Sequence, residues 1–411
     1  MLRTALGFAV LAPLAGCVTG SVMQGTAIET DASPWPYIFR RLPRALRDVI
    51  EQPDHEVQLI YTRINRDADG AAILTQSAHG LAPHRWFAAA SMIKLPIALL
   101  ACEALAAAGG DSATRIALAA PPETGEWSAD EPLAEAFERC LRRLFVVSDN
   151  IAYNRLYEWL GQDTVHARLT ELGWPNARAI ARIGSTDAQA NRRVGAVSLI
   201  GADGRSLQSL PARRSEQQRV FPFGDARKGS GFMVDGKVIP GPHDFSHANY
   251  LPLADAHDML QRLLFPDSVP ANLRWRIPGA LRMELLRAMS LYPRESPDPL
   301  YAESDYPDGY AKMFVVGDGK ARAPAGLRMY GKSAQAYGYM GDCAYLVDRA
   351  RGTECLLSAS VYANADGIFN DDIYEYDSIS IPFLAALGRA VLDHEASRVR
   401  FHSARFEGLP L

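Results

Sequence analysis

Ser91 and Lys94 lie three residues apart in the segment AASMIKLP, and this pair is the first candidate for chemistry in the chain. On a helix, residues at i and i+3 share a face, so the lysine ammonium group can reach the serine hydroxyl. A serine attacks a carbonyl group efficiently only when a nearby base removes its proton, and a lysine can be that base once burial or another cation lowers its pKa. The chain has only six lysines, which makes each one informative. A Ser-x-x-Lys match by itself still arises easily by chance.

Ser148, Asp149 and Asn150 form a second polar cluster at the start of the segment SDNIAYNRLYEWLG. Serine, aspartate and asparagine are favoured at helix N-termini, and a helix evidently begins here. Capping of that helix is therefore a sufficient explanation when the cluster is considered alone.

Lys332 and Ser333 end the segment GLRMYGKS, which fits the pattern G-x-x-x-x-G-K-[ST] of a phosphate-binding loop. Such a loop needs a buried strand before it and a helix that begins at the Lys-Ser pair. Here Leu, Arg, Met and Tyr occupy the middle positions, and the following segment AQAYGYMGDCAYLV also has the composition of a strand. We therefore expect the Lys-Ser pair to lie on a strand, and a nucleotide partner is not predicted.

The elements that must position these clusters follow from hydrophobic periodicity. Residues 56–78 are predicted to form a β-hairpin, and residues 90–108 are apolar on almost all sides, which is typical of a buried helix. Strands at both ends of the chain with helices between them indicate an antiparallel sheet completed late. The further helices are expected at 131–145, 150–160 and 164–172, in the segments LADAHDMLQRLL and ALRMELLRAMSL, and at 380–394.

Residues 186–250 differ from the rest of the chain. They are richer in Gly, Arg, Ser and Pro and show little periodicity, although the segment GFMVDGKVIPG suggests a small hairpin around Asp-Gly. We interpret this region as an insertion to which no chemistry can be assigned.

The three polar clusters occur in the order of the motifs Ser-x-x-Lys, Ser-Asp-Asn and Lys-[Ser/Thr] of class A β-lactamases and penicillin-binding proteins. The chain resembles this serine hydrolase superfamily beyond the motifs. The segment QLIYTRINRDADG is similar to the family's opening hairpin, FAAASMIKLPIALL to its nucleophile helix and SDNIAYNRLYEWLG to its Ser-Asp-Asn helix. Together with YGKSAQAYGYMGDCAYLV, these segments extend the resemblance over most of 56–185 and 250–395.

The resemblance implies an α+β fold in which an antiparallel sheet is flanked by helices and joined by a helical subdomain. The boundaries that we expect are a signal peptide at 1–16, a tether at 17–45, and one hydrolase domain at about 46–400, with a sheet part at about 50–80 and 325–395 and a helical part at about 95–320.

The resemblance also implies a role for each matched residue. Ser91 would be the acylated nucleophile, Lys94 its general base, and Ser148 the group that passes a proton to the leaving nitrogen. Backbone N–H groups of a preorganised oxyanion hole stabilise the charge that develops during such an attack. The substrate-binding groups would be Asn150 for an amide, Lys332 and Ser333 for a carboxylate, and the N–H of Gln335, with that of Ser91, for the oxyanion.

One departure from the family concerns the second half of the reaction. Class A enzymes carry a Glu-x-x-Leu-Asn segment whose glutamate activates the water that hydrolyses the acyl-enzyme. The corresponding segment here, ARIGSTDAQANRR, contains no glutamate, and only Asp187 or Asn191 offers a polar substitute. Acylation is therefore expected, whereas efficient deacylation is in doubt.

The N-terminal segment MLRTALGFAVLAPLAGC has one Arg, a short apolar run and small residues before Cys17, as in a secretory signal. Leu14-Ala15-Gly16-Cys17 resembles the bacterial lipobox, in which the cysteine is lipidated; an ordinary signal peptide that contains a cysteine is the alternative. We therefore expect an exported protein, anchored by lipid in the bacterial cell envelope and facing the periplasm. The formal charge of −4 and the absence of a basic tail give no reason to expect a nucleic-acid partner.

Four further cysteines would be exported with the chain, and none forms a Cys-x-x-Cys pair, so no metal or other cofactor is predicted. An oxidising compartment permits disulfides. Resemblance to family members with a disulfide between two helices implies a bond between Cys102 and Cys140, and Cys343–Cys355 is a weaker expectation.

The sequence thus predicts an exported serine hydrolase that forms an acyl-enzyme with a carboxylate-bearing amide or β-lactam, including fragments of peptidoglycan. The alternative is a non-catalytic lipoprotein that binds the cell wall with the same fold.

Overall fold

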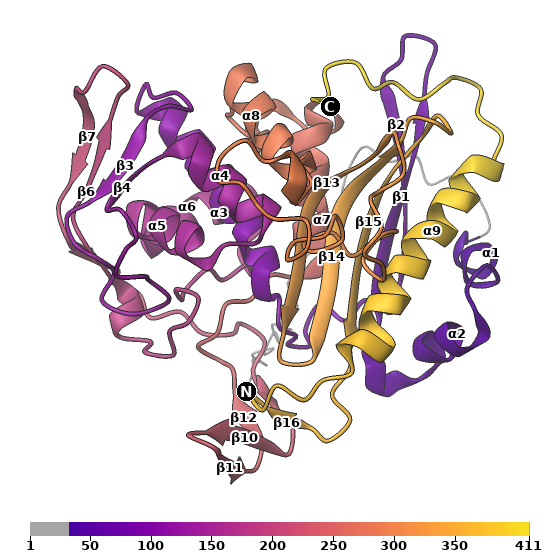
Figure 1. Ribbon diagram of the computed structural model, residues 1–411, viewed down its shortest axis with the longest axis horizontal. Helices are drawn as coiled ribbons and strands as arrows, with labels where there is room; N and C mark the ends of the chain where they lie inside the picture. Colours follow the sequence, from indigo (N-terminus) through magenta and orange to yellow (C-terminus); the bar gives the residue numbers. More distant parts are fainter. Residues whose placement is uncertain (1–32, 411) are drawn as a thin grey trace, which may run out of the picture.

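The structure is a computed structural model that describes residues 33–410, so the expected signal peptide and Cys17 lie outside the described residues. Its centre is a five-stranded antiparallel sheet with the order β13-β14-β15-β1-β2 (Figure 1). The N-terminal hairpin joins the C-terminal strands where β1 pairs with β15, which confirms the predicted late completion of the sheet. These strands are β1 (Gln58–Arg66), β2 (Ala72–His79), β13 (Leu327–Ala336), β14 (Tyr339–Asp348) and β15 (Thr353–Tyr362).

Alternate residues of β1 face two different cores, as the two-residue period of a strand requires. Leu59 and Tyr61 belong to the core beneath α9, and Ile60 and Ile64 belong to the core that faces the other helices. One face of the sheet is covered by α9 with α1 and α2 beside it (Figure 1). Those helices are α1 (Trp35–Phe39), α2 (Arg44–Glu51) and α9 (Ile381–Ser397).

The helical part is built around α3 (Lys94–Ala107), which is buried on nearly all sides, as predicted for residues 90–108. By length and composition, Ala90–Ala107 is the one segment among residues 33–410 that could cross a membrane, but 72% of it is buried inside the fold. The helix expected at 131–145 begins only at Phe137, because Ala134–Ala136 pairs as a strand with β3. The other helices are α4 (Phe137–Val146), α5 (Asn150–Leu160), α6 (Gln162–Glu171), α7 (Leu253–Leu264) and α8 (Gly279–Ser290).

The segment 186–250 contributes strands to several small sheets. β6 and β7 extend a four-stranded sheet of order β4-β3-β6-β7, and β10 and β11 form the predicted hairpin around Asp235-Gly236. β10 also pairs in parallel with β16, a short strand between β15 and α9 in the sequence (Figure 1). The small strands are β3 (Arg115–Leu118), β4 (Ala134–Ala136), β5 (Arg193–Val194), β6 (Val197–Ile200), β7 (Ser206–Leu210), β8 (Arg213–Arg214), β9 (Arg227–Lys228), β10 (Gly231–Val234), β11 (Lys237–Pro240), β12 (His243–Asp244) and β16 (Ile368–Phe369).

The two expected disulfides are wrong, because all four cysteines of the described chain are free and buried. Cys140 directs its thiol to Glu135, with Sγ 3.0 Å from Oε2, and not to Cys102. Cys343 pairs with Ser358 across the sheet, and Cys343 and Cys355 belong to the cores on opposite faces of the sheet. A bond between these last two would have to pass through the sheet.

Candidate active site

Ser91 lies in a 3₁₀ turn, Ala90–Ile93, directly before the first residue of α3. In a 3₁₀ helix residues i and i+3 eclipse one another, so this tighter turn brings Ser91 and Lys94 together more closely than an α-helix would. Lys94 Nζ lies 3.0 Å from Ser91 Oγ and donates a hydrogen bond to it. Ala90, with φ of 42°, is left-handed, and this strained conformation sets the entry into the turn.

Lys94 is fully buried, and its amine contacts three residues. Besides Ser91, Nζ donates to Asn150 Oδ1 at 2.6 Å, to Ser148 Oγ at 3.1 Å and to the Ser148 carbonyl. Burial lowers the pKa of Lys94 to about 7, although the negative charges of Asp149 and Glu126 partly oppose this shift. A substantial fraction of this lysine is therefore a neutral amine near neutral pH, as a general base requires.

The Ser-Asp-Asn cluster both caps a helix and lines the site. Asp149 is the N-cap of α5, where its Oδ1 accepts a hydrogen bond from Ala152 N at 2.8 Å. Ser148 precedes the cap in a left-handed conformation with φ of 60°, which is strained for a residue with a Cβ. The capping role thus belongs to Asp149 alone, and Ser148 and Asn150 on either side of it both contact Lys94.

Lys332 reaches the same cluster from β13. Its Nζ donates to Ser148 Oγ at 2.8 Å and to the Ser333 carbonyl at 2.9 Å. Burial lowers the pKa of Lys332 well below its ordinary value, and the nearby positive charge of Lys94 lowers it further. β13 lies against the 3₁₀ turn of Ser91, so a strand and a helix start form the two sides of the site.

Ser333 and Gln335 are less directly placed. The Ser333 hydroxyl is buried and donates to the Ala311 carbonyl at 2.9 Å, so its proton has to turn away from Ala311 before it can bind a carboxylate. Gln335 is exposed on β13, where it pairs with Met340, and its side chain has no role in the cluster. The structure therefore joins Ser91, Lys94, Ser148, Asn150 and Lys332 by hydrogen bonds, and their roles stay predictions, as do those of Ser333 and Gln335.

Glu126 is a residue of the site that sequence reasoning missed. Its Oε1 accepts a hydrogen bond from Asn150 Nδ2 at 2.8 Å. Asp187 and Asn191, the two polar substitutes considered for the absent glutamate, have other contacts. Asp187 caps the backbone N–H groups of Gln189 and Ala190, and buried Asn191 accepts from the N–H of Arg182. No sequence motif includes Glu126. It lies in a loop, and the tertiary contacts of that loop bring its side chain to Asn150.

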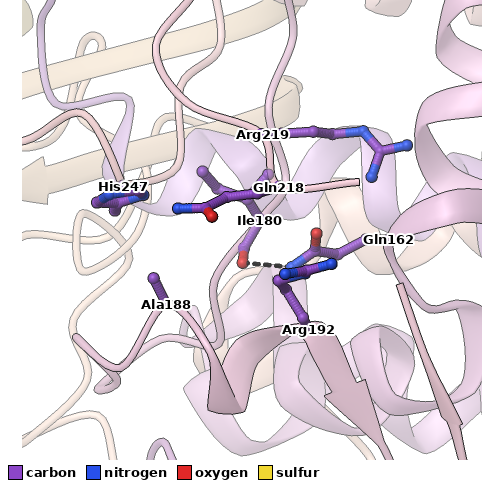
Figure 2. Close-up of a pocket in the computed structure, with 7 residues that line it drawn as sticks. All are labelled: Gln162, Ile180, Ala188, Arg192, Gln218, Arg219 and His247. Carbon is purple, nitrogen blue, oxygen red and sulfur yellow. Dashed lines mark hydrogen bonds between the residues drawn. The ribbon is translucent and has the colours of Figure 1, made fainter. Parts of the chain in front are cut away.

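The cavity shown in Figure 2 is small, partly open to solvent and separate from this cluster. It lies between the start of α6 and the inserted segment, and Gln162 Nε2 donates to the Ile180 carbonyl beside it. Its two arginines are held by the protein itself, since Arg192 donates to the Ser215 carbonyl and Arg219 to Asp163. The cavity lining is Gln162, Ile180, Ala188, Arg192, Gln218, Arg219 and His247.

Comparison with known proteins agrees with the α+β fold. The sequence model of the "Beta-lactamase enzyme family" matches residues 41–204. A representative class A β-lactamase from Bacteroides cellulosilyticus superimposes with a TM-score of 0.50 over 90% of this chain and 100% of that one, at 11% identity. A β-lactamase from Sphaerobacter thermophilus gives 0.48 over the same shares at 14% identity.

No curated protein matches the chain. At 11% identity, the Bacteroides structure shows a common fold and nothing finer. The chain therefore has the fold of a class A β-lactamase, and the family model matches residues 41–204, which are less than half of the chain.

Proposed function

We propose that the protein is an exported serine hydrolase that forms an acyl-enzyme through Ser91. The observation that carries this proposal is the buried amine of Lys94, which lies 3.0 Å from Ser91 Oγ and has a pKa of about 7. A neutral amine at hydrogen-bond distance is the base that a serine hydroxyl needs in order to attack a carbonyl group.

In the acylation step, Lys94 takes the proton of Ser91 as Oγ bonds to the substrate carbonyl carbon. The N–H groups of Ser91 and Gln335 stabilise the resulting oxyanion. When the carbon–nitrogen bond breaks, its electron pair goes to nitrogen, and Ser148 gives its proton to that nitrogen while it receives the proton held by Lys94. The distance of 3.1 Å between Lys94 Nζ and Ser148 Oγ supports this transfer.

The substrate class follows from the charge of the site. Lys332 supplies a buried amine beside Ser148, whose protonated form a bound anion would stabilise, and Ser333 adds a hydroxyl on the same strand. Lysine binds an anion as a point charge, and a carboxylate would compensate the cost of burying its ammonium form. The proposed substrates are therefore amides or β-lactams that carry a carboxylate, including fragments of peptidoglycan, with Asn150 holding the amide.

Export is part of the proposal and is supported by the apolar N-terminal segment and the lipobox-like Leu-Ala-Gly-Cys17. A lipid on Cys17 would hold the enzyme at a membrane of the cell envelope, with its domain in the periplasm. Cell-wall fragments and β-lactams are both found in that compartment.

Covalent labelling tests the proposed nucleophile. The wild-type protein and Ser91→Ala are incubated with a fluorescent penicillin and a fluorophosphonate, with Ser304→Ala, a change at an exposed serine outside the three motifs, as the matched control. We expect the wild type and Ser304→Ala to gain the mass of the probe and Ser91→Ala to remain unmodified. Equal labelling of all three proteins contradicts the assignment, and binding of penicillin without a change of protein mass favours the non-catalytic lipoprotein.

A further inference from the structure

The segment 181–193 lacks the glutamate that class A enzymes carry in the corresponding segment, but the site contains a carboxylate from another loop. Glu126 Oε1 accepts from Asn150 Nδ2 at 2.8 Å, and Asn150 Oδ1 accepts from Lys94 Nζ at 2.6 Å. Lys94 in turn donates to Ser91 Oγ at 3.0 Å. An unbroken series of hydrogen bonds therefore connects the Glu126 carboxylate to the nucleophile.

The backbone of Glu126 is fixed on both sides. Its N–H donates to the Ile183 carbonyl at 2.9 Å, and its carbonyl accepts from Asn154 Nδ2 at 3.0 Å. Asn154 is completely buried on α5, one turn after Asn150, and it also bonds to the N–H and the carbonyl of Ile183. One asparagine therefore holds the loop of Glu126 and the 183–185 segment against the helix that carries Asn150.

Two further contacts hold the same loop. Gly184, with φ of +83°, lies so close to Glu126 that an added Cβ would be 2.8 Å from its Cγ and 2.9 Å from its N. The next residue, Trp127, packs its ring against the Arg155 guanidinium of α5 at 4.9 Å. The carboxylate is thus presented by a fixed support while it remains accessible to solvent. Preorganised groups of this kind are what catalysis requires.

We propose that Glu126 is the general base that activates water for hydrolysis of the acyl-enzyme. The inference rests on the proposed function, because it presupposes an acyl group on Ser91. It also offers a base for deacylation, the step that the absence of the usual glutamate leaves in doubt.

In this step the Glu126 carboxylate takes one proton from a water molecule as the water oxygen bonds to the acyl carbon. The bond between that carbon and Ser91 Oγ then breaks, and its electron pair stays on Oγ. Lys94, left neutral by acylation, receives the proton that Glu126 holds by way of solvent and gives a proton to Oγ, so that Glu126 is again a carboxylate and Lys94 again a neutral amine. The products are the free carboxylic acid and the original serine.

Intact-protein mass spectrometry with penicillin G, combined with measurement of hydrolysed product, tests the assignment. The variants are Glu126→Gln and the matched control Glu123→Gln, which lies three residues earlier on the same loop and bonds to Arg193. We expect Glu126→Gln to form the adduct at a rate close to that of the wild type and to lose it about 10²–10⁴-fold more slowly, the range typical of a lost general base. Glu123→Gln should behave like the wild type.

Two readouts distinguish a base from a residue that only orients Asn150. Deacylation by the wild type should slow at acidic pH as a carboxylate is protonated, whereas the residual rate of Glu126→Gln should lack this dependence. Added formate should shorten the lifetime of the adduct of Glu126→Ala, because it replaces the missing carboxylate. If Glu126→Gln slows acylation by the same factor as deacylation, Glu126 only positions Asn150, and the proposal is overturned.

The remaining outcomes also decide the matter. The inference is wrong if the Glu126→Gln adduct and the wild-type adduct decay at the same rate, whether both are short-lived or both persist. Absence of both adduct and product in every protein contradicts the proposed function itself. Adduct formation with unchanged decay contradicts only the role of Glu126, so the two failures are distinguishable.

Discussion

Lys94 and Lys332 both donate to the hydroxyl of Ser148, at 3.1 and 2.8 Å, although one begins a helix and the other lies on a strand far along the chain. The Ser148 oxygen has two lone pairs and can accept both bonds. Burial lowers the pKa of both amines, and the positive charge of Lys94 lowers the pKa of Lys332 further. The hydroxyl of Ser148, the proposed proton-transfer group, is thus hydrogen-bonded both to the proposed base, Lys94, and to the proposed anion-binding group, Lys332.

The carboxylate-binding role of Lys332 predicts a defect that depends on the substrate. Lys332→Gln should lower the second-order rate of acylation by penicillin G by about 10–100-fold, the effect of one charge-assisted hydrogen bond. The rate of acylation by the methyl ester of the same penicillin, which lacks the carboxylate, should be nearly the same in Lys332→Gln as in the wild type. Lys320→Gln, a change at an exposed lysine, is the control. An equal defect with acid and ester would show that Lys332 acts on the chemistry and not on the carboxylate.

The lowered pKa of Lys94 predicts how acylation depends on pH. Below about 7 the ammonium form dominates and cannot accept the proton of Ser91, so the rate should fall about tenfold per pH unit and level off above that value. Stopped-flow measurement of adduct formation gives the profile. Because the charge of Asp149 raises the pKa of Lys94, Asp149→Asn should move the midpoint to lower pH. A profile that is flat between pH 5 and 9 would exclude Lys94 as the base.

The N-cap of α5 predicts a loss of stability at Asp149. Asp149→Ala removes the acceptor of the Ala152 N–H and the contact with Arg143 Nε at 3.0 Å. The free energy of unfolding in urea should fall by about 1–2 kcal/mol, as for other lost caps. Asp149→Asn keeps a capping oxygen and should lose less. Equal stability of the alanine variant and the wild type would show that the helix does not depend on this cap.

Because Cys102 and Cys140 are free, we predict that both can be alkylated in the unfolded protein without prior reduction, unlike two cysteines joined by a disulfide. Cys102 and Cys140 should resist iodoacetamide in the folded protein, because both are buried and burial raises the pKa of each thiol. After unfolding without reductant, both should be alkylated, and peptide mass spectrometry identifies each site. Alkylation that requires prior reduction would show that a disulfide joins them after all.

The sequence predicted best those features that depend on local pattern. The apolar run at 90–108 gave a buried helix because no side of it is polar, and the spacing of Ser91 and Lys94 placed them together on one turn. The convergence of Lys332 with this turn rested on resemblance, since no local rule brings β13 beside it. The family and the α+β fold were predicted in the same way.

The features that were missed depend on tertiary contacts. Glu126 reaches Asn150 only because Gly184 and Asn154 fix the course of its loop. The disulfide between Cys102 and Cys140 was wrong because resemblance says nothing about the direction of a side chain, and Cys140 points to Glu135. Strands such as β6 and β7 are too short to show a period in the sequence.

The pairing of β10 with β16 means that the inserted segment is not a detachable module. β6, from the same segment, pairs with β3 in the helical part. Excision of 186–250 to imitate a shorter homologue would leave β16 and β3 with unpaired edges. Exposed strand edges promote aggregation by pairing with strands of other molecules. Shortening experiments should therefore stop at the tip around Asp235-Gly236, where the chain can be trimmed without opening either border.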